Sequence, residues 1–254
     1  MSNGKLLCTS CGAYNVGNQT VSGEEGDGSI ILRNVKSAKE DRLSVGPFNR
    51  CWGGGIVKTS TTLLGGMPGA GKSTMLLQMC DLFAKVVEGE VLYIASEEDL
   101  PAIKMRAERL QLERDDKVRM LPAMSGVANV GAILQSREPK AVIVDSLQGL
   151  FGKDADDCTQ ALDTLKKFAV LLQGPVIIVS QVTKDGDYAG QMSFQHHVDC
   201  LMFLTPDEER EEGDDEEAER TLWVKKNRYG RAFVESHFAM TEFGLFCTDE
   251  EDES

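Results

Sequence analysis

Residues 66–73 constrain the fold more than any other part of the chain. They read Gly-Met-Pro-Gly-Ala-Gly-Lys-Ser, which is the spacing G-x-x-x-x-G-K-[ST] of a phosphate-binding loop. Glycines at these places let the backbone turn tightly and bring its N–H groups close to phosphate oxygens. Such a loop needs a strand before it and a helix after it, because the helix N-terminus supplies partial positive charge to the anion.

The flanking residues provide that context. Residues 58–64 are rich in Thr and Leu, apolar residues recur at helical spacing over 76–87, and Gly89 ends the helix. We therefore expect Lys72 to reach the β- and γ-phosphates and Ser73 to reach Mg²⁺. A plain glycine-rich turn is the alternative, but it does not explain the Lys-Ser pair. The residues assigned to nucleotide binding are Gly66, Pro68, Gly69, Ala70, Gly71, Lys72, Ser73 and Thr74.

Strand-like apolar runs alternate with helical patterns between residues 58 and 180. This alternation predicts an α/β fold with a mostly parallel central sheet and helices on both faces. After residue 198, three strand-like runs without intervening helices predict an antiparallel extension at the sheet edge. The expected strands are 61–64, 91–95, 118–121, 141–144, 176–180, 198–204, 221–225 and 233–238, and the expected helices are 73–87, 101–112, 127–136 and 158–173.

Length and composition bound the domain organisation. With 254 residues, of which 41% are hydrophobic, the chain fits one α/β domain at 58–246. We expect an N-terminal arm and linker at 1–57 and an acidic tail at 247–254. No apolar run approaches the roughly 20 residues that a membrane span needs, and no apolar signal region opens the chain. Seven scattered cysteines also favour a reducing, cytoplasmic setting.

The formal net charge of −14 is concentrated in two segments. Residues 207–219 carry ten acids and one arginine, and residues 249–253 carry five acids. These segments account for the whole net charge, so the rest of the chain is balanced and a nucleic acid partner is not excluded. We expect the first segment to be a solvated hairpin tip; a role in repelling partners or mimicking DNA is the alternative.

Three predicted parallel strands end in polar residues, at the edge where ligands bind in such sheets. Asp145 ends a buried strand in the manner of a Walker B carboxylate and is expected to help hold Mg²⁺; capping of the next turn is the alternative. Glu97 is the candidate for orienting or deprotonating the attacking water, and Glu98 and Asp99 are then acids of a helix start. Gln181 is a candidate sensor of the γ-phosphate.

Taken together, these segments resemble the RadA/Sms proteins, a family of bacterial RecA-like ATPases of recombination and repair. The resemblance covers roughly residues 45–246. The segment 226–230 is its most specific part, since it is similar to a Lys-Asn-Arg-Phe-Gly motif that ordinary RecA proteins lack. Besides the loop, it rests on Trp52-Gly53-Gly54-Gly55, Ser96-Glu97-Glu98-Asp99, 103–110, Val144-Asp145-Ser146-Leu147-Gln148, 182–186, 189–190, 197–199 and Lys226-Asn227-Arg228-Tyr229-Gly230.

The resemblance implies a RecA-like P-loop ATPase that binds ATP and Mg²⁺ at the subunit interfaces of a hexameric ring. Lys226 and Arg228 would then reach the phosphates of a neighbouring subunit. The physical logic is independent, because cations two residues apart on a strand point the same way and transition-state charge on phosphate requires them. A basic strand end that faces solvent is the alternative.

A second implied site is the segment 184–196, which would face the ring channel and contact single-stranded DNA. Its residues Lys184, Gly186, Gly190 and Phe194 would supply charge neutralisation, backbone approach and a stacking face. A surface loop without this role is the competing interpretation.

The chain departs from the family in three places. Of the family's four-cysteine zinc motif only Cys8 and Cys11 have counterparts, and a structural zinc site needs four ligands, so we expect no zinc within one chain; a relic turn or a zinc shared between chains are the alternatives. We also expect no counterpart of the family's protease-like C-terminal domain. The stretch 149–157, where a first DNA-contacting loop would lie, is short and acidic.

The leading functional hypothesis is a DNA-dependent ATPase that acts in recombination or repair on single-stranded or branched DNA. A helicase-like motor that translocates on single strands is the second hypothesis. A regulatory or assembly ATPase of RecA fold that acts on protein is the third, favoured by the acidic segment and the short first loop.

Overall fold

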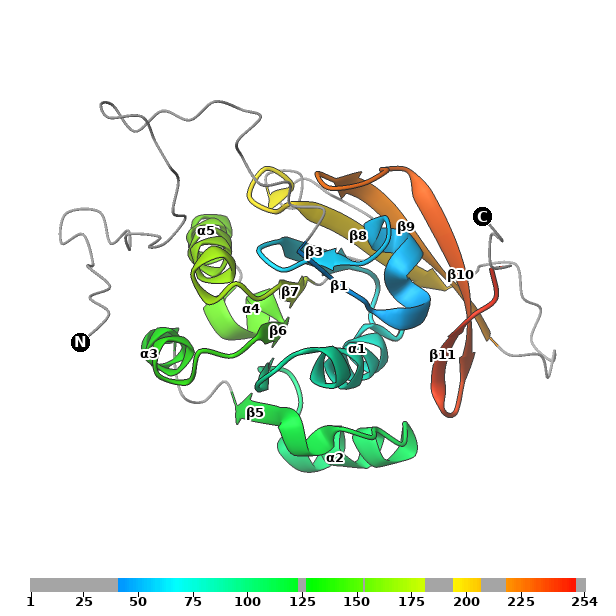
Figure 1. The fold of residues 1–254 in the computed structure, drawn as a ribbon, viewed down its shortest axis with the longest axis horizontal. Helices are drawn as coiled ribbons and strands as arrows, with labels where there is room; N and C mark the ends of the chain where they lie inside the picture. The colour runs from blue at the N-terminus through cyan, green and yellow to red at the C-terminus, as the bar shows by residue number, and fades with distance from the viewer. Residues whose placement is uncertain (1–40, 123–126, 153, 181–193, 207–217, 250–254) are drawn as a thin grey trace. The chain divides into compact units, whose positions relative to one another are not determined.

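A nine-stranded sheet organises the part of the chain that the structure, a computed structural model, describes: residues 41–122, 127–152, 154–180, 194–206 and 218–249. The strand order is β11-β10-β9-β8-β3-β7-β6-β4-β5 (Figure 1). The strands from β8 to β5 are parallel, and β9, β10 and β11 continue the sheet as antiparallel neighbours. Their bounds are β3 (Thr61–Gly65), β4 (Val91–Ala95), β5 (Val118–Pro122), β6 (Ala141–Asp145), β7 (Val176–Val179), β8 (Cys200–Pro206), β9 (Ala218–Asn227), β10 (Val234–Thr241) and β11 (Gly244–Cys247).

Helices cover both faces of this sheet, and each face has its own apolar core. Helices α1 (Lys72–Val86) and α2 (Leu100–Arg109) contribute to one core, whereas α3 (Val127–Arg137), α4 (Leu147–Phe151) and α5 (Ala155–Leu172) contribute to the other. Side chains alternate along the strands accordingly: on β4, Tyr93 faces the first core, and Leu92 and Ile94 face the second. The structure thus confirms the predicted α/β class, with helices on both faces and an antiparallel extension.

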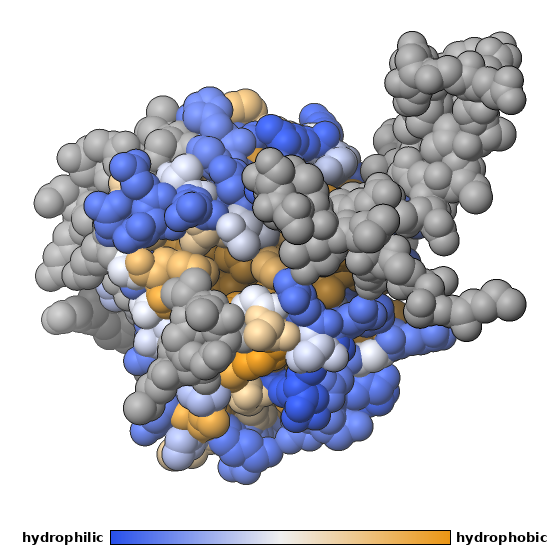
Figure 2. Space-filling model, turned by 90° about the vertical axis from the view of Figure 1, so that its left-hand side faces the viewer, coloured by the Kyte–Doolittle hydropathy of each residue, from blue (hydrophilic) through white to orange (hydrophobic). Residues whose placement is uncertain are grey.

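The side of the molecule that carries α3 and α5 is shown in Figure 2. Hydrophilic residues border a hydrophobic area there, and the aromatic rings of Phe151 and Phe168 pack against the second core while remaining partly exposed.

No helix in the described ranges combines the length and the hydrophobicity that crossing a bilayer requires.

Polar side chains fix where three helices begin. Asp99 accepts a hydrogen bond from the amide of Ala102 at the start of α2, and the Ser146 hydroxyl accepts one from Gly149 at the start of α4. Asp154 accepts bonds from two amides at the start of α5. Most of the acidic stretch 149–157 therefore belongs to α4 and to the first turn of α5, where carboxylates are favoured by the helix dipole.

Residues 41–57 are part of the folded unit, which corrects the linker expected there. They form the short strands β1 (Arg42–Leu43) and β2 (Ile56–Val57) and the 3-10 helix η3 (Gly46–Trp52). Phe48 is fully buried and its ring stacks on that of Phe238 with the centroids 5.1 Å apart. Weak periodicity over so short a segment favours a linker, whereas the burial of Phe48 comes from a contact with Phe238, far along the chain.

The acidic tail expected at 247–254 also needs correction at its start. Cys247 ends β11, and the carboxylate of Asp249 accepts a hydrogen bond from the amide of His237. These residues close the sheet edge, so the folded unit extends to at least Asp249. Residues 250–254 lie outside the described ranges.

Candidate nucleotide-binding site

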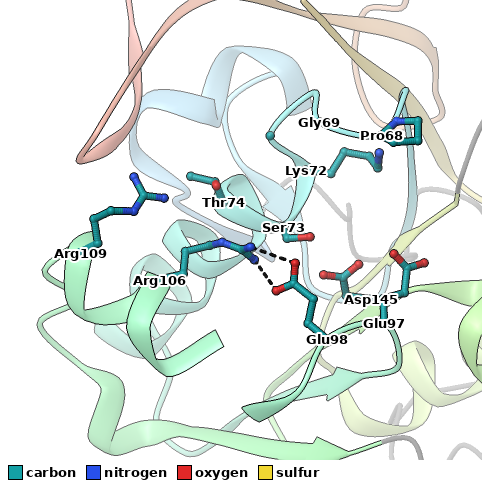
Figure 3. A pocket seen from close by; sticks show the side chains of 11 residues that line it. Pro68, Gly69, Lys72, Ser73, Thr74, Glu97, Glu98, Arg106, Arg109 and Asp145 are labelled. Carbon is teal, nitrogen blue, oxygen red and sulfur yellow. Dashed lines mark hydrogen bonds and ion pairs between the residues drawn. The ribbon is translucent and has the colours of Figure 1, made fainter. Parts of the chain in front are cut away.

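The residues predicted to bind a nucleotide gather at the carboxyl ends of β3, β4 and β6. The register places Ala95 of β4 beside Asp145 of β6, so the residues after both strands share one edge with the loop after β3. A cavity of about 400 Å³ opens there, within the size range of small-molecule sites. It is lined by Pro68, Gly69, Gly71, Lys72, Ser73, Thr74, Glu97, Glu98, Arg106, Arg109 and Asp145 (Figure 3).

Two loop glycines are required by the backbone itself. Gly66 has φ 148°, and a Cβ atom there would lie 2.3 Å from the carbonyl oxygen of Leu204. Gly71, the N-cap of α1, has φ 103°, and a Cβ atom there would lie 2.3 Å from the Met240 side chain. Both positions combine a positive φ with close approach, which only glycine accommodates without strain. The loop therefore has the conformation that its sequence spacing predicts.

Lys72 is held against the loop backbone. Its Nζ donates hydrogen bonds to the carbonyls of Gly66 at 2.7 Å and Met67 at 2.8 Å. Burial lowers the pKa of the Lys72 ammonium, and the nearby carboxylates of Asp145 and Glu97 act in the opposite direction. The Lys72 side chain is thus a buried cation between the loop and two acids. Because it lines the cavity, it is placed to bind the phosphate of a nucleotide there.

Asp145 provides a buried carboxylate next to the loop. It is 6% exposed, and its Oδ2 accepts a hydrogen bond of 2.5 Å from the Tyr93 hydroxyl. Burial raises the pKa of Asp145, hydrogen bonds from Tyr93 and Ser73 oppose the rise, and the charges of Glu97 and Glu98 add to it. A carboxylate and a hydroxyl are the hard oxygen ligands that Mg²⁺ prefers, so Asp145 and Ser73 fit the expected metal.

The three acids after β4 take three different roles. Glu97 accepts a hydrogen bond from the Ser146 hydroxyl and lies beside Asp145 in Figure 3. Glu98 turns instead to Arg106, with which it forms two parallel hydrogen bonds of 2.8 and 2.9 Å. Asp99 caps α2. Of the three acids, Glu97 is therefore the one that lines the cavity without being paired with Arg106 or capping α2, and its role in orienting water stays a prediction.

Two arginines of α2 line the cavity without having been assigned a role from the sequence. Arg106 is held by Glu98, and Arg109 donates to the carbonyl of Glu242 in the turn between β10 and β11. The sequence does indicate that Arg106 and Arg109 lie together, because arginines three residues apart share one face of a helix. What the sequence did not reveal is that this face turns towards the cavity.

The cations expected to act on phosphate lie at the other end of the same sheet. Asn227 at the end of β9 pairs with Cys200 at the start of β8, and Arg228 donates to the carboxylate of Asp199 at 3.0 Å. The amide of Asp199 in turn donates to the carbonyl of Thr61, the first residue of β3. The phosphate loop, in contrast, follows Gly65, the last residue of the same strand. Five strand residues, roughly 16 Å, therefore separate the two sites within one chain.

Asp199 organises this opposite end. It is 2% exposed, accepts hydrogen bonds from the amide and hydroxyl of Thr61, and forms ion pairs with Lys166 and Arg228. Burial alone would raise the pKa of Asp199, but the bonds from Lys166 and Thr61 outweigh it and hold the pKa below its usual range. No local pattern in the sequence marks Asp199 for this role, because its partners Thr61 and Lys166 lie far along the chain.

Lys226 and Phe194 are engaged inside the chain. The Lys226 Nζ donates to the carbonyls of Val198, at 2.8 Å, and Gln195. Burial lowers the pKa of Lys226, and the positive charges of Arg228 and Lys166 lower it further. Phe194 is 4% exposed and packs in the second core. The stacking face expected of Phe194 is therefore corrected: its ring is part of the second core, because it packs against the apolar side chains on that face of the sheet.

Comparison with known proteins agrees with this geometry. The sequence profile of a family described as "AAA domain" matches residues 34–187. The chain belongs to this AAA domain family. A solved structure, a KaiC-like protein from Pyrococcus horikoshii OT3, matches with a TM-score of 0.66 and 16% identity over 82% of this chain and 99% of that one. At that identity the match supports the fold alone, which is the RecA-like fold expected from the sequence.

Curated relatives confirm the resemblance to the RadA/Sms proteins. The DNA repair protein RadA of Escherichia coli (strain K12) is 34% identical over 94% of this chain and 55% of its own length. The DNA repair protein RadA of Bacillus subtilis (strain 168) is 32% identical over 84% of this chain and 46% of its own. The chain thus spans about half the length of the curated relatives it matches.

Several predicted residues fall outside the described ranges. They include the sensor candidate, three of the DNA-loop residues, the two N-terminal cysteines and most of the acidic segment. The nearest described neighbour of the sensor is Ser180, whose hydroxyl accepts a 2.7 Å hydrogen bond from Gln148. The residues concerned are Gln181, Lys184, Gly186, Gly190, Cys8, Cys11 and 207–217.

Proposed function

We propose that this chain is a DNA-dependent ATPase of recombination and repair, whose active site is completed by a second copy. The observation that carries the proposal is the convergence of Lys72, Ser73, Asp145 and Glu97 on one cavity. Its support from relatives is that proteins described as DNA repair proteins match 94% of the chain.

Each residue of the cavity has a role that its chemistry suits. The loop backbone and Lys72 bind the phosphates, and Ser73 with Asp145 would hold Mg²⁺, which neutralises phosphate charge when bound. Glu97 orients the attacking water or accepts its proton, because it lies beside Asp145 and is fixed by Ser146. Gln181 is retained as the proposed γ-phosphate sensor.

The remaining requirement is positive charge opposite the loop, where the transition state develops charge on phosphate. Lys226 and Arg228 are too far from the cavity of their own chain to supply it. A neighbouring copy that places its β9 end against the cavity would bring both. We therefore favour a closed ring, with a hexamer as the specific proposal, since head-to-tail contacts close into rings.

The DNA partner is the finer part of the proposal. Lys184, Gly186 and Gly190 remain its candidate contacts, without the stacking by Phe194 that was first expected. That burial, together with the acids at the start of α5, favours a second candidate: an ATPase of the same fold that acts on protein.

One experiment separates these functions. The rate of ATP hydrolysis is measured for the wild type and for Lys72→Ala, with and without single-stranded DNA, over a series of salt concentrations. We expect DNA to stimulate the wild type, the stimulation to weaken with salt because counterions are released on binding, and Lys72→Ala to be inactive. A rate of ATP hydrolysis that DNA does not change at any salt concentration would favour the protein-directed function. An active Lys72→Ala variant would refute ATP hydrolysis at this loop.

A further inference from the structure

The turn between β9 and β10 carries an exposed aromatic side chain. Phe233 is 75% exposed, more than any other large apolar side chain in the described ranges. It lies five residues after Arg228, and its amide donates to the carbonyl of Val224 at 2.7 Å. Exposure of a phenylalanine to water has a free-energy cost that burial elsewhere would recover.

The backbone of Phe233 is also strained. Its φ is 58°, in the left-handed region that bulky side chains avoid. Three other described non-glycine residues have positive φ, namely Gln111, Glu138 and Gln173, and each lies within two residues of the end of a helix, where this conformation is common. Phe233 follows no helix, so neither helix capping nor core packing accounts for an aromatic residue there.

The turn holds Phe233 in place. Arg42 donates to the carbonyl of Tyr229 at 2.5 Å and to those of Trp52 and Gly55. Gly230 packs so closely on the Trp52-Gly53-Gly54-Gly55 segment that a Cβ atom there would lie 3.3 Å from the Cα atom of Gly53. The ring is therefore presented on a fixed support, which reduces the entropy lost on binding.

The two ends of the sheet carry exposed features that match. Residues 225–233 contain four cations and no acid. At the cavity, residues 96–99 contain three acids, of which Glu98 is paired with Arg106. Leu100 and Met105, which follow these acids on α2, are 36% and 71% exposed. A basic turn with one aromatic side chain thus fits an edge that carries exposed apolar side chains beside carboxylates, as in a head-to-tail contact between copies.

We propose that Phe233 anchors the contact between two copies of this chain by packing on the edge of the neighbour's nucleotide cavity. This rests on the proposed function, in which the neighbour's cavity receives Lys226 and Arg228. Packing of Phe233 would position Lys226 and Arg228 at the neighbour's cavity, because the ring and the two cations belong to the same end of β9 and the turn after it. It is an interface residue that acts through the cations and does not touch the nucleotide.

The test uses Phe233→Asn in the full chain, because asparagine tolerates positive φ and removes the ring. Phe246→Asn is the matched control, since Phe246 is also half exposed, at 51%, but lies on β11. Sedimentation in Mg²⁺ and a non-hydrolysable ATP analogue gives the assembly state, and ATP hydrolysis is followed as a function of protein concentration. Thermal unfolding of the dilute protein and single-stranded DNA binding are measured in parallel.

For Phe233→Asn we expect the concentration for half-maximal assembly and hydrolysis to rise at least about tenfold, as for a lost aromatic anchor. We expect a melting temperature no lower than that of the wild type, and assembly of Phe246→Asn and Phe233→Tyr close to wild type. Unchanged assembly, equal effects of both asparagine variants, or loss of DNA binding with assembly intact would overturn the proposal. Those outcomes leave the proposed function standing, whereas an active Lys72→Ala refutes that function without reference to Phe233.

Discussion

Two buried aspartates mark the two ends of the central sheet, and their surroundings are opposite in kind. Asp199, at the amino ends of the strands, accepts bonds from Thr61 and pairs with Lys166 and Arg228, so its pKa is lowered. Asp145, at the carboxyl ends, lies near further acids, and burial raises its pKa. One carboxylate is neutralised by the protein, and the charge of the other is left to a ligand.

This difference indicates how the molecule divides its work. A buried ion pair with all its partners in place is a finished part of the fold, and breaking it is costly. A buried carboxylate whose ionised form is disfavoured is stabilised when a cation binds beside it, so its site favours cation binding. The carboxyl end is therefore suited to bind a metal nucleotide, and the amino end is suited to hold the basic turn that would act on a neighbouring copy in the proposed assembly.

The largest expected effect is on activity at the carboxyl end. Asp145→Asn should lower ATP hydrolysis by roughly 10–100-fold, the range typical of residues that hold a metal through its bound water, since it removes the carboxylate proposed to help hold Mg²⁺. Stability should not fall: a raised folded-state pKa means that ionised Asp145 destabilises the fold at neutral pH, and asparagine removes that charge. Hydrolysis rates and urea unfolding measure both effects.

The control for this change is Asp116→Asn. Asp116 is 68% exposed and pairs with Arg114 at the surface, so activity and stability should both stay close to the wild type. Clear destabilisation by Asp145→Asn would mean that its charge is compensated within the chain, and the contrast between the two aspartates would be lost.

At the amino end the expected effect is on stability. Asp199→Asn should reduce the free energy of unfolding by about 3 kcal/mol, the lower end of the range for broken buried pairs, because Lys166 and Arg228 are partly exposed. The folded-state pKa is lowered, so this stabilisation is present above the unfolded pKa of about 3.9 and disappears as the pH falls through the folded value.

Urea unfolding at neutral and at acidic pH measures this change. Asp163→Asn is the control, since Asp163 is 51% exposed and pairs with His197 at the surface; it should cost less than about 1 kcal/mol. Equal losses for the two variants, or a loss for Asp199→Asn that persists at low pH, would show that Asp199 is not the organising charge of this end.

The carboxyl end was largely predictable from the sequence. The loop, Asp145 and Glu97 are each tied to a local pattern: a fixed glycine spacing, a buried strand and the residues that follow its end. Alternating strands and helices then place these patterns at one edge of the sheet. The fold class could be predicted for the same reason, because the pattern of each helix and strand is contained in a few consecutive residues.

The amino end was not predictable, because its contacts join distant parts of the chain. Asp199 meets Thr61 across 138 residues, and Arg42 meets Tyr229 across 187. No local pattern marks such pairs, and for the same reason the sequence does not predict the folded structure of residues 41–57 or the burial of Phe194. The positive φ of Phe233 is likewise invisible in a sequence that offers no glycine there.

The central claim is that the cavity at one end of the sheet is completed by the basic turn at the other end of a second copy. Mixing Lys72→Ala subunits with Arg228→Ala subunits tests it directly, since each variant supplies the half that the other lacks. We expect each variant alone to be inactive and the mixture to hydrolyse ATP, with most activity at intermediate ratios. A mixture as inactive as its components, although sedimentation shows the two assembled together, would contradict it.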